Sequence, residues 1–151
     1  MDKIKIRNAR KQDSKLILNL INELADFEKL LAPDKSACRR LIKDAFTNNP
    51  LFRILLAEVD SVIAGYAFYF YTYSSFKAKK TLYLEDIFIS EIFRSKGIGK
   101  LFFNELIKIA KKNKCGAMEW IVLDWNENAI KFYDKLGANE KKEWKIYRLD
   151  I

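Results

Sequence analysis

The sequence predicts an α/β fold, a mixed β-sheet with helices on its faces. In several segments apolar and polar residues alternate, or β-branched and aromatic residues form short runs, as in strands. Between these segments, apolar residues recur about every three to four positions, as in helices that bury one face. The chain of 151 residues is 50% hydrophobic and 14% aromatic, which predicts one compact domain, 1–151, with a substantial core.

The N-terminal third predicts one strand and two helices. Residues 3–7 alternate as a strand does. Asp13 or Ser14 can cap the first helix, which Pro33 terminates. Ser36 then begins the second helix.

The middle of the chain predicts three strands. The runs 52–59 and 62–73 are joined by a short turn at residues 60–61, which indicates an antiparallel hairpin. A polar loop, 74–80, leads to a third long strand, 81–89.

The C-terminal part predicts two further helices and two further strands. The helix 101–110 precedes the strand 117–124, the helix 128–136 and a last strand, 144–149. The complete order is β-α-α-β-β-β-α-β-α-β, which predicts a mixed sheet with helices on its faces.

The composition excludes several kinds of site. The chain has no histidine, which removes Ser-His-Asp and Cys-His nucleophile systems and histidine-bound zinc. Cys38 and Cys115 match neither a zinc spacing nor a disulfide framework, so we expect two buried small hydrophobes and no metal. Proton transfer must therefore use Tyr, Asp, Glu, Lys or water.

The net charge of +8 raises the question of nucleic-acid binding. The lysines are spread along the chain, and the densest group, Lys108, Lys111, Lys112 and Lys114, lies at a predicted helix end, where it suits the helix dipole. No apolar run reaches the roughly 18 residues of a membrane span, and the N-terminus lacks the apolar segment of a signal peptide. We expect a cytoplasmic protein that binds neither nucleic acid nor membrane.

The stretch from Arg94 to Lys100 reads Arg-Ser-Lys-Gly-Ile-Gly-Lys and looks like a phosphate-binding turn. Gly97 and Gly99 let a ligand approach the main chain, and the first N–H groups of the next helix have no internal partner. Arg94, Lys96 and Lys100 add positive charge. The spacing matches neither G-x-G-x-x-G nor G-x-x-x-x-G-K-[ST]. The prediction of a nucleotide-like cofactor therefore depends on the position of the turn between a predicted strand and a predicted helix.

The turn and several other motifs resemble the GCN5-related N-acetyltransferases, the GNAT superfamily. Residues 94–99 match the family's cofactor turn, [RQ]-x-x-G-x-[GA]. Other motifs look like the spermidine/spermine and thialysine acetyltransferase branch: 22–28, 69–73, 82–88, 124–127, 130–133 and 136–138. The resemblance implies a GNAT fold, with a central mixed, mostly antiparallel sheet flanked by helices. It also implies transfer of an acetyl group from acetyl-CoA to an amine.

The resemblance places acetyl-CoA along the turn and the strand before it. Main-chain N–H groups of the turn would hold the pyrophosphate, and the strand would pair with the pantetheine arm. The N–H of Phe88 would bind the thioester oxygen, an effect of about 3–4 kcal/mol in other enzymes. Asn126 would cap the following helix or bind the cofactor arm. The cofactor-binding residues so implied are Ile87, Phe88, Ile89, Arg94, Ser95, Lys96, Gly97, Ile98, Gly99, Lys100 and Asn126.

The resemblance also nominates residues for the chemistry. Tyr133 would act as general acid near the cofactor sulfur, because a phenol with a pKa of about 10 keeps its proton at neutral pH. Glu28, Glu85 and Asp86 would bind a cationic amine, and Glu85 would relay the amine proton to water. Phe27 stands where the branch has a tyrosine, so the amine pocket lacks that hydroxyl.

Other departures from the branch leave the amine open. Residues 74–76, Ser-Ser-Phe, replace Asp-Pro-Trp, and Glu119 stands where the polyamine enzyme has histidine. The amine could be a polyamine, a diamine or a thialysine-like compound. The alternatives are a protein, peptide or antibiotic N-acetyltransferase, a non-catalytic CoA-binding sensor, and a nucleic-acid-binding domain. The branch forms homodimers, and the segment 144–149 could pair across such an interface.

Overall fold

The computed structural model describes residues 2–151. They form two compact units, a larger one that ends at Trp120 and a smaller one, Ile121–Ile151. Within the described residues, the larger unit holds a five-stranded sheet and the smaller unit holds one helix. A single domain over residues 1–151 stays a prediction.

The sheet has the strand order β1-β2-β3-β4-β5. The bounds of its strands are Ile4–Asn8 for β1, Arg53–Val59 for β2, Val62–Ser74 for β3, Lys79–Ile89 for β4 and Ala117–Glu119 for β5. The first four strands pair antiparallel, and β5 pairs parallel to β4. This arrangement confirms the predicted mixed, mostly antiparallel sheet.

The β3–β4 hairpin is longer than predicted. Ser74 pairs with Lys79, and Tyr73 pairs with Lys80, so three of the seven residues of the expected loop 74–80, Ser74, Lys79 and Lys80, belong to strands. Lysines are compatible with such a strand end, because the long side chain keeps its ammonium in water while the main chain stays paired.

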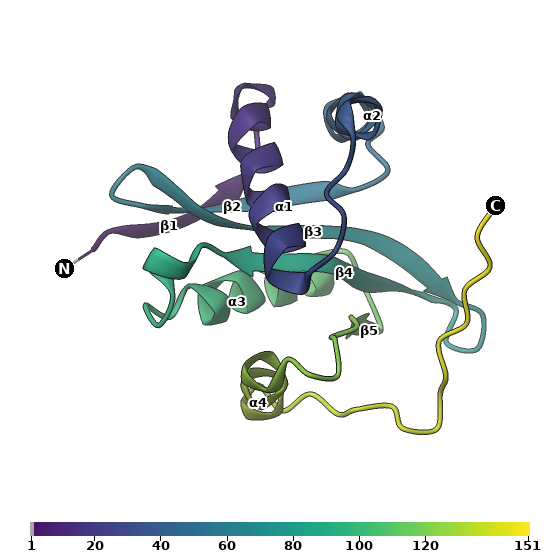
Figure 1. Ribbon diagram of the computed structural model, residues 1–151. Helices are drawn as coiled ribbons and strands as arrows, with labels where there is room; N and C mark the ends of the chain where they lie inside the picture. Colours follow the sequence, from purple (N-terminus) through teal and green to yellow (C-terminus); the bar gives the residue numbers. More distant parts are fainter. Residues whose placement is uncertain (1) are drawn as a thin grey trace. The chain divides into compact units, whose positions relative to one another are not determined.

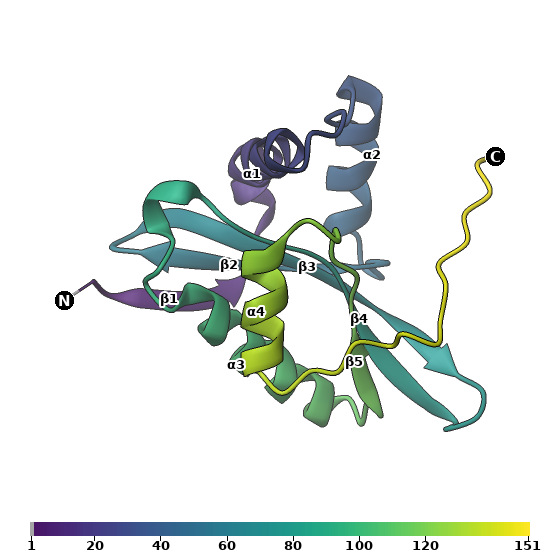
Figure 2. The same cartoon turned by 60° about the horizontal axis from the view of Figure 1, so that its bottom comes forward.

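Helices cover both faces of the sheet. Figures 1 and 2 show α1, Ser14–Glu28, and α2, Lys35–Ala45, over one face, and α3, Ile98–Lys112, over the other. Two 3-10 turns, η1 (Lys11–Asp13) and η2 (Glu91–Phe93), precede α1 and the glycine turn.

A core cluster lies between α1 and the sheet. It contains Ile17, Leu20, Ile54, Leu56, Tyr66 and Phe88. Burial of each such side chain contributes about 1.5–3 kcal/mol, so this cluster fixes α1 on β2, β3 and β4. On the other face, α3 buries Ile98, Phe102, Phe103, Leu106 and Ala110.

Helix α2 begins one residue earlier than predicted, and its N-cap residue lies two positions before the expected start at Ser36. The helix begins at Lys35, and the carboxylate of Asp34 accepts a hydrogen bond from the Ala37 N–H at 2.7 Å. The hydroxyl of Ser36, the residue expected to begin the helix, accepts from Arg40 instead. Both residue types are good caps, and the aspartate holds the position here.

The smaller unit contains α4, Glu127–Lys135, close to the predicted helix 128–136. The expected last strand, 144–149, is wrong: no strand forms within residues 121–151, and β5 ends at Glu119, well short of the expected 124. An isolated strand leaves its main-chain groups without partners, so an alternating pattern forms a strand only where a neighbour is present.

The cysteines are less buried than predicted: Cys38 and Cys115 are half-buried free thiols.

The basic end of α3 is confirmed, with Lys111 and Lys112 in its last turn. Among residues 2–151, no helix combines the length and the apolar character that a membrane crossing requires.

Arg7 connects β1 with η1 and β2. Its guanidinium donates to both carboxylate oxygens of Asp13, at 2.7 and 3.0 Å, and also to Glu58. Asp13 holds the N-cap position of α1, yet its carboxylate accepts from Arg7 and from the Arg10 N–H rather than capping that helix. The bond from Arg7 lowers the pKa of Asp13 below its usual value. This nearly buried ion pair therefore stabilises the fold only while Asp13 is ionised.

We expect Asp13→Asn to lower the free energy of unfolding by about 1.5–3 kcal/mol at pH 7, the range for a hydrogen bond to a charged group. Because the pKa of Asp13 is lower in the folded chain than its ordinary 3.8, the stabilisation is complete above that value. It is lost as the pH falls through the folded pKa. Urea unfolding of both proteins at pH 7 and at acid pH measures the difference, and a difference that persists unchanged to about pH 2 would contradict this account.

Candidate functional site

The glycine turn, residues 94–100, has the geometry of an anion site. Ser95 and Gly97 have left-handed φ values of 63° and 78°, and Gly97 is the N-cap of α3. The Leu101 N–H donates to the Gly97 carbonyl at 3.2 Å, which is the first hydrogen bond of the helix. The N–H groups of the three helical residues before Leu101 therefore have no partner within the helix. A Cβ on Gly97 would meet nothing within 4 Å, which leaves open space beside these donors. The turn can therefore hold an anion by its main chain.

The side chains around the turn have different roles. Ile98 is 1% exposed and anchors the turn in the core, Gly99 is half-buried, and Lys100 is exposed. Lys96 pairs with Asp2 at the surface. The predicted contacts of residues 95–100 with a cofactor stay predictions, because they depend on a bound ligand.

The Arg94 side chain binds protein groups. Its Nε donates to the Ile89 carbonyl at 3.0 Å. Its guanidinium lies 5.0 Å from the centre of the Phe27 ring and 5.6 Å from that of Phe88. Arg94 thus connects the turn to the end of β4 and to the end of α1.

The strand before the turn has an unpaired stretch. β5 pairs only with residues Thr81 to Tyr83 of β4. Across residues 2–151, no strand pairs with 84–89 on that edge. The expected cofactor residues Ile87, Phe88 and Ile89 lie in this stretch, where an extended ligand can add as a further strand.

A β-bulge in β4 centres on Glu85. Phe68 pairs with Asp86 and Tyr69 pairs with Leu84, so Glu85 is the extra residue of β4. Bulges bend a strand and redirect its side chains. Glu85 is exposed and Asp86 is half-buried.

Glu28, Glu85 and Asp86 form an acidic cluster between the end of α1 and β4. Burial raises the pKa of Asp86 to about 6, with further contributions from the charges of Glu85 and Glu28, and the hydrogen bond from Tyr66 opposes this rise. Burial also raises the pKa of Glu28. The structure thus brings together all three expected acidic residues in a site that favours a cation.

Phe27 lies between the acidic cluster and the turn. Its side chain is 37% exposed, and the centres of its ring and the Phe88 ring are 6.4 Å apart. Together with the Arg94 contact, this places the expected substrate residue Phe27 beside the end of β4.

Asn126 and Tyr133 belong to the unit 121–151. The Asn126 side chain accepts a hydrogen bond from the Ala129 N–H at 3.3 Å, which confirms the cap of α4, one of its two expected roles. Its contact with the cofactor arm stays a prediction. Tyr133 is half-buried on α4, with its ring centre 5.7 Å from that of Phe132. Its place beside a cofactor sulfur stays a prediction.

Sequence reasoning missed two residues of β3. Tyr66 donates a hydrogen bond to Asp86 at 3.1 Å. Gly65 lets the Phe88 carbonyl approach so closely that a Cβ would lie 2.4 Å from its oxygen. A glycine inside a strand indicates a close approach or a bulge, so Gly65 was detectable as a special position. The contact of Tyr66 with Asp86 depends on the register of two strands, which left no local signal in the sequence.

The residues described, 2–151, contain no group of three or more His, Cys, Asp or Glu side chains that could hold a metal ion.

Residues 18–138 match the model of the acetyltransferase (GNAT) family. The thialysine N-epsilon-acetyltransferase of Mus musculus is 34% identical over 161 residues, which cover 99% of this chain and 94% of that protein. Spermidine/spermine N(1)-acetyltransferase-like protein 1 of Homo sapiens is 34% identical over 99% of this chain, which spans only 23% of the human protein. L-ornithine N5-acetyltransferase NATA1 of Arabidopsis thaliana is 50% identical over 60% of this chain and 40% of its own length.

Solved structures share the fold. A possible acetyltransferase from Clostridium difficile 630 has a TM-score of 0.85 at 22% identity, over 98% of this chain and 97% of that one. The aminoglycoside N-acetyltransferase AAC(6')-Iy in complex with CoA has a TM-score of 0.82 at 19% identity, over 100% and 97% of the two chains. At these sequence identities the likeness concerns the fold alone.

We expect Asp86→Asn to stabilise the protein at pH 7 by about 1–3 kcal/mol. The pKa of Asp86 is about 6 when folded against an ordinary value of 3.8, so the folded chain holds this proton more tightly than the unfolded chain. The free energy of unfolding therefore falls as the pH rises from about 4 to 6, and the penalty is complete above 6. Urea unfolding at pH 4 and pH 7 measures the gain, which should vanish at the lower pH. A variant less stable than the wild type at pH 7 would contradict this prediction.

Proposed function

Because the chain belongs to the acetyltransferase (GNAT) family and is an acyltransferase domain, we propose that it acetylates the primary amine of a small diamine, polyamine or thialysine-like substrate with acetyl-CoA. The observation that carries the proposal is the acidic cluster of Glu28, Glu85 and Asp86 next to an anion-binding turn. The turn suits the phosphates of one substrate, and the carboxylates suit the ammonium of the other.

The names of three relatives support an alkylamine as the acetyl acceptor. They are named for thialysine, spermidine/spermine and L-ornithine, which all carry primary alkylamines. Such an amine, with a pKa of about 10.4, is mostly protonated at neutral pH. A site must therefore first attract the cation and then remove a proton, and carboxylates serve both purposes.

Three parts of acetyl-CoA would find partners on this chain: the pyrophosphate, the pantetheine arm and the thioester. The main-chain N–H groups of Ile98, Gly99 and Lys100 would bind the pyrophosphate at the start of α3. The unpaired stretch of β4 would bind the pantetheine arm, and the Phe88 N–H would polarise the thioester oxygen. Acetyl-CoA supplies the activated acetyl group, and these donors orient it.

The remaining steps concern protons. Glu85, exposed at the bulge, would accept the proton of the amine and pass it to water. The freed nitrogen then forms the new C–N bond as the C–S bond breaks. Tyr133 would donate a proton to the departing sulfur, since a phenol is protonated at neutral pH.

The hairpin tip lies well away from the acidic cluster of the same chain. Residues 74–76 lie at the tip, six positions from Glu85 along β4, or about 20 Å at roughly 3.3 Å per residue. A carboxylate lost at this tip therefore does not weaken the acidic cluster of the same chain.

The proposal also includes a cytoplasmic homodimer, in which the exposed side chains of Trp144 and Ile146 would be covered by the partner.

Thiol release from acetyl-CoA tests the proposal against putrescine, spermidine, spermine, thialysine, lysine, ornithine and a basic peptide. We expect turnover of at least one free amine. Tyr133→Phe should lower kcat by about 10²-fold or more, because it removes the general acid. Turnover of the peptide alone would favour a protein acetyltransferase, and no turnover despite acetyl-CoA binding would favour a sensor.

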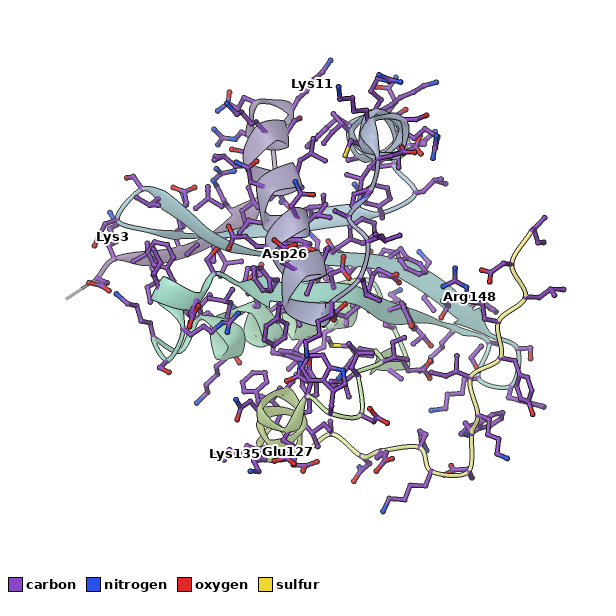
Figure 3. The ribbon with its side chains drawn as sticks, in the orientation of Figure 1. Lys3, Lys11, Asp26, Glu127, Lys135 and Arg148 are labelled. Carbon is purple, nitrogen blue, oxygen red and sulfur yellow. The ribbon has the colours of Figure 1, made fainter. Side chains whose placement is uncertain are left out.

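The same assay accommodates a matched pair of variants on α1. Glu28→Gln removes a charge of the acidic cluster and should raise the KM of the amine about tenfold while the KM of acetyl-CoA stays unchanged. Asp26→Asn is the control, because Asp26, labelled in Figure 3, is an exposed carboxylate on the same helix. It lies two positions before Glu28, which corresponds to about 200° around an α-helix. Equal effects of both changes would show that general surface charge, not the cluster, attracts the amine.

A further inference from the structure

Tyr66 of β3 lies fully buried below the acidic cluster. Its side chain is 0% exposed and belongs to the core cluster with Leu56 and Phe88. Its hydroxyl donates a hydrogen bond to Asp86 Oδ2 at 3.1 Å. A buried hydroxyl without a partner is destabilising, so this bond determines where the phenol can point.

The register of the sheet explains this contact. Tyr66 pairs with Phe88, and Asp86 is two residues away on the same face of β4. Such diagonal neighbours lie within reach of an aromatic side chain. The ring is clamped in the core, so the hydroxyl is fixed relative to the strand that carries Asp86.

The direction of the hydrogen bond follows from the surroundings. Burial raises the pKa of Tyr66, and the charge of Asp86 and of both glutamates adds to the rise. The phenol therefore keeps its proton and acts as the donor, and the carboxylate accepts.

Asp86 faces titratable groups from three elements: Glu85 on β4, Glu28 on α1 and Tyr66 on β3. Burial and the two glutamates favour its neutral form. The Tyr66 hydroxyl is the group among them that favours the anion. A neutral Asp86 would lose the charge that attracts an ammonium.

We propose that Tyr66 is a positioning residue whose hydroxyl fixes the Asp86 carboxylate, as an anion, toward the cationic amine. The inference rests on the proposed function, because it assumes that the acidic cluster binds an amine. Tyr66 acts through Asp86 and contacts neither substrate. A purely structural tyrosine would leave the pH profile of the reaction unchanged when its hydroxyl is removed.

The test uses Tyr66→Phe, which deletes the hydroxyl and keeps the ring. Tyr69→Phe is the matched control: Tyr69 is 2% exposed on the same strand, and its register partner Leu84 places it on the opposite face of the sheet. Thermal unfolding first establishes that both variants are folded. The kcat/KM for the preferred amine is then measured from about pH 5 to 9.

We expect the acid limb of this profile to move upward by about one pH unit in Tyr66→Phe, the size expected for loss of a hydrogen bond to a charged group. At pH 7 the KM of the amine should rise about twofold, because a shift of one unit from about 6 leaves roughly half of Asp86 ionised at this pH. The KM of acetyl-CoA should not change, and kcat at alkaline pH should stay within about twofold. Tyr69→Phe should follow the wild type.

A carboxyl ¹³C titration gives a readout that does not depend on activity. The Asp86 signal is assigned by its loss in Asp86→Asn, and it should titrate at higher pH in Tyr66→Phe than in the wild type. An unchanged Asp86 titration, or an unchanged pH profile in an active protein, overturns this inference alone. A wild type that acetylates none of the amines overturns the proposed function, and this inference with it.

Discussion

The pairing of β3 with β4 shifts by one residue at Glu85, and the positions of the acidic residues follow from this shift. Leu84 pairs with Tyr69, and Asp86 pairs with Phe68. Because Tyr69 and Phe68 are adjacent on β3, they point to opposite faces, and so do Leu84 and Asp86. In a regular strand, residues two apart share a face. The bulge thus turns Asp86 and Phe88 toward α1, where Asp86 meets Glu28 and Tyr66.

A second set of contacts connects the bulged strand to the glycine turn. Arg94 binds the Ile89 carbonyl and lies over the rings of Phe27 and Phe88. Gly65 permits the close approach of the Phe88 carbonyl on the neighbouring strand. The acidic cluster and the glycine turn are therefore connected to the same short stretch of β4. Because burial raises the pKa of the half-buried Asp86, we expect its ionised carboxylate to lower stability at neutral pH, which is typical of residues retained for function.

The sequence predicted the elements that depend on local signals. The glycine turn, the four antiparallel strands and α1 follow from spacing and periodicity, and Asn126 caps α4 as expected. The predictions failed where a distant partner decides the outcome. Residues 144–149 alternate as a strand does, yet no neighbouring strand pairs with them in the described chain. The bulge at Glu85 and the contact from Tyr66 to Asp86 depend on the register between two strands, which a single sequence does not specify.

The most direct test of the account is an amide ¹H–¹⁵N titration of the protein with CoA, because the central claim is that the glycine turn and the bulged strand form one substrate site. The account predicts that the largest shifts occur at residues 95–100 and 87–89, while the amides of α2 stay unchanged. Shifts that spare residues 95–100 and gather on another face of the larger unit would contradict it.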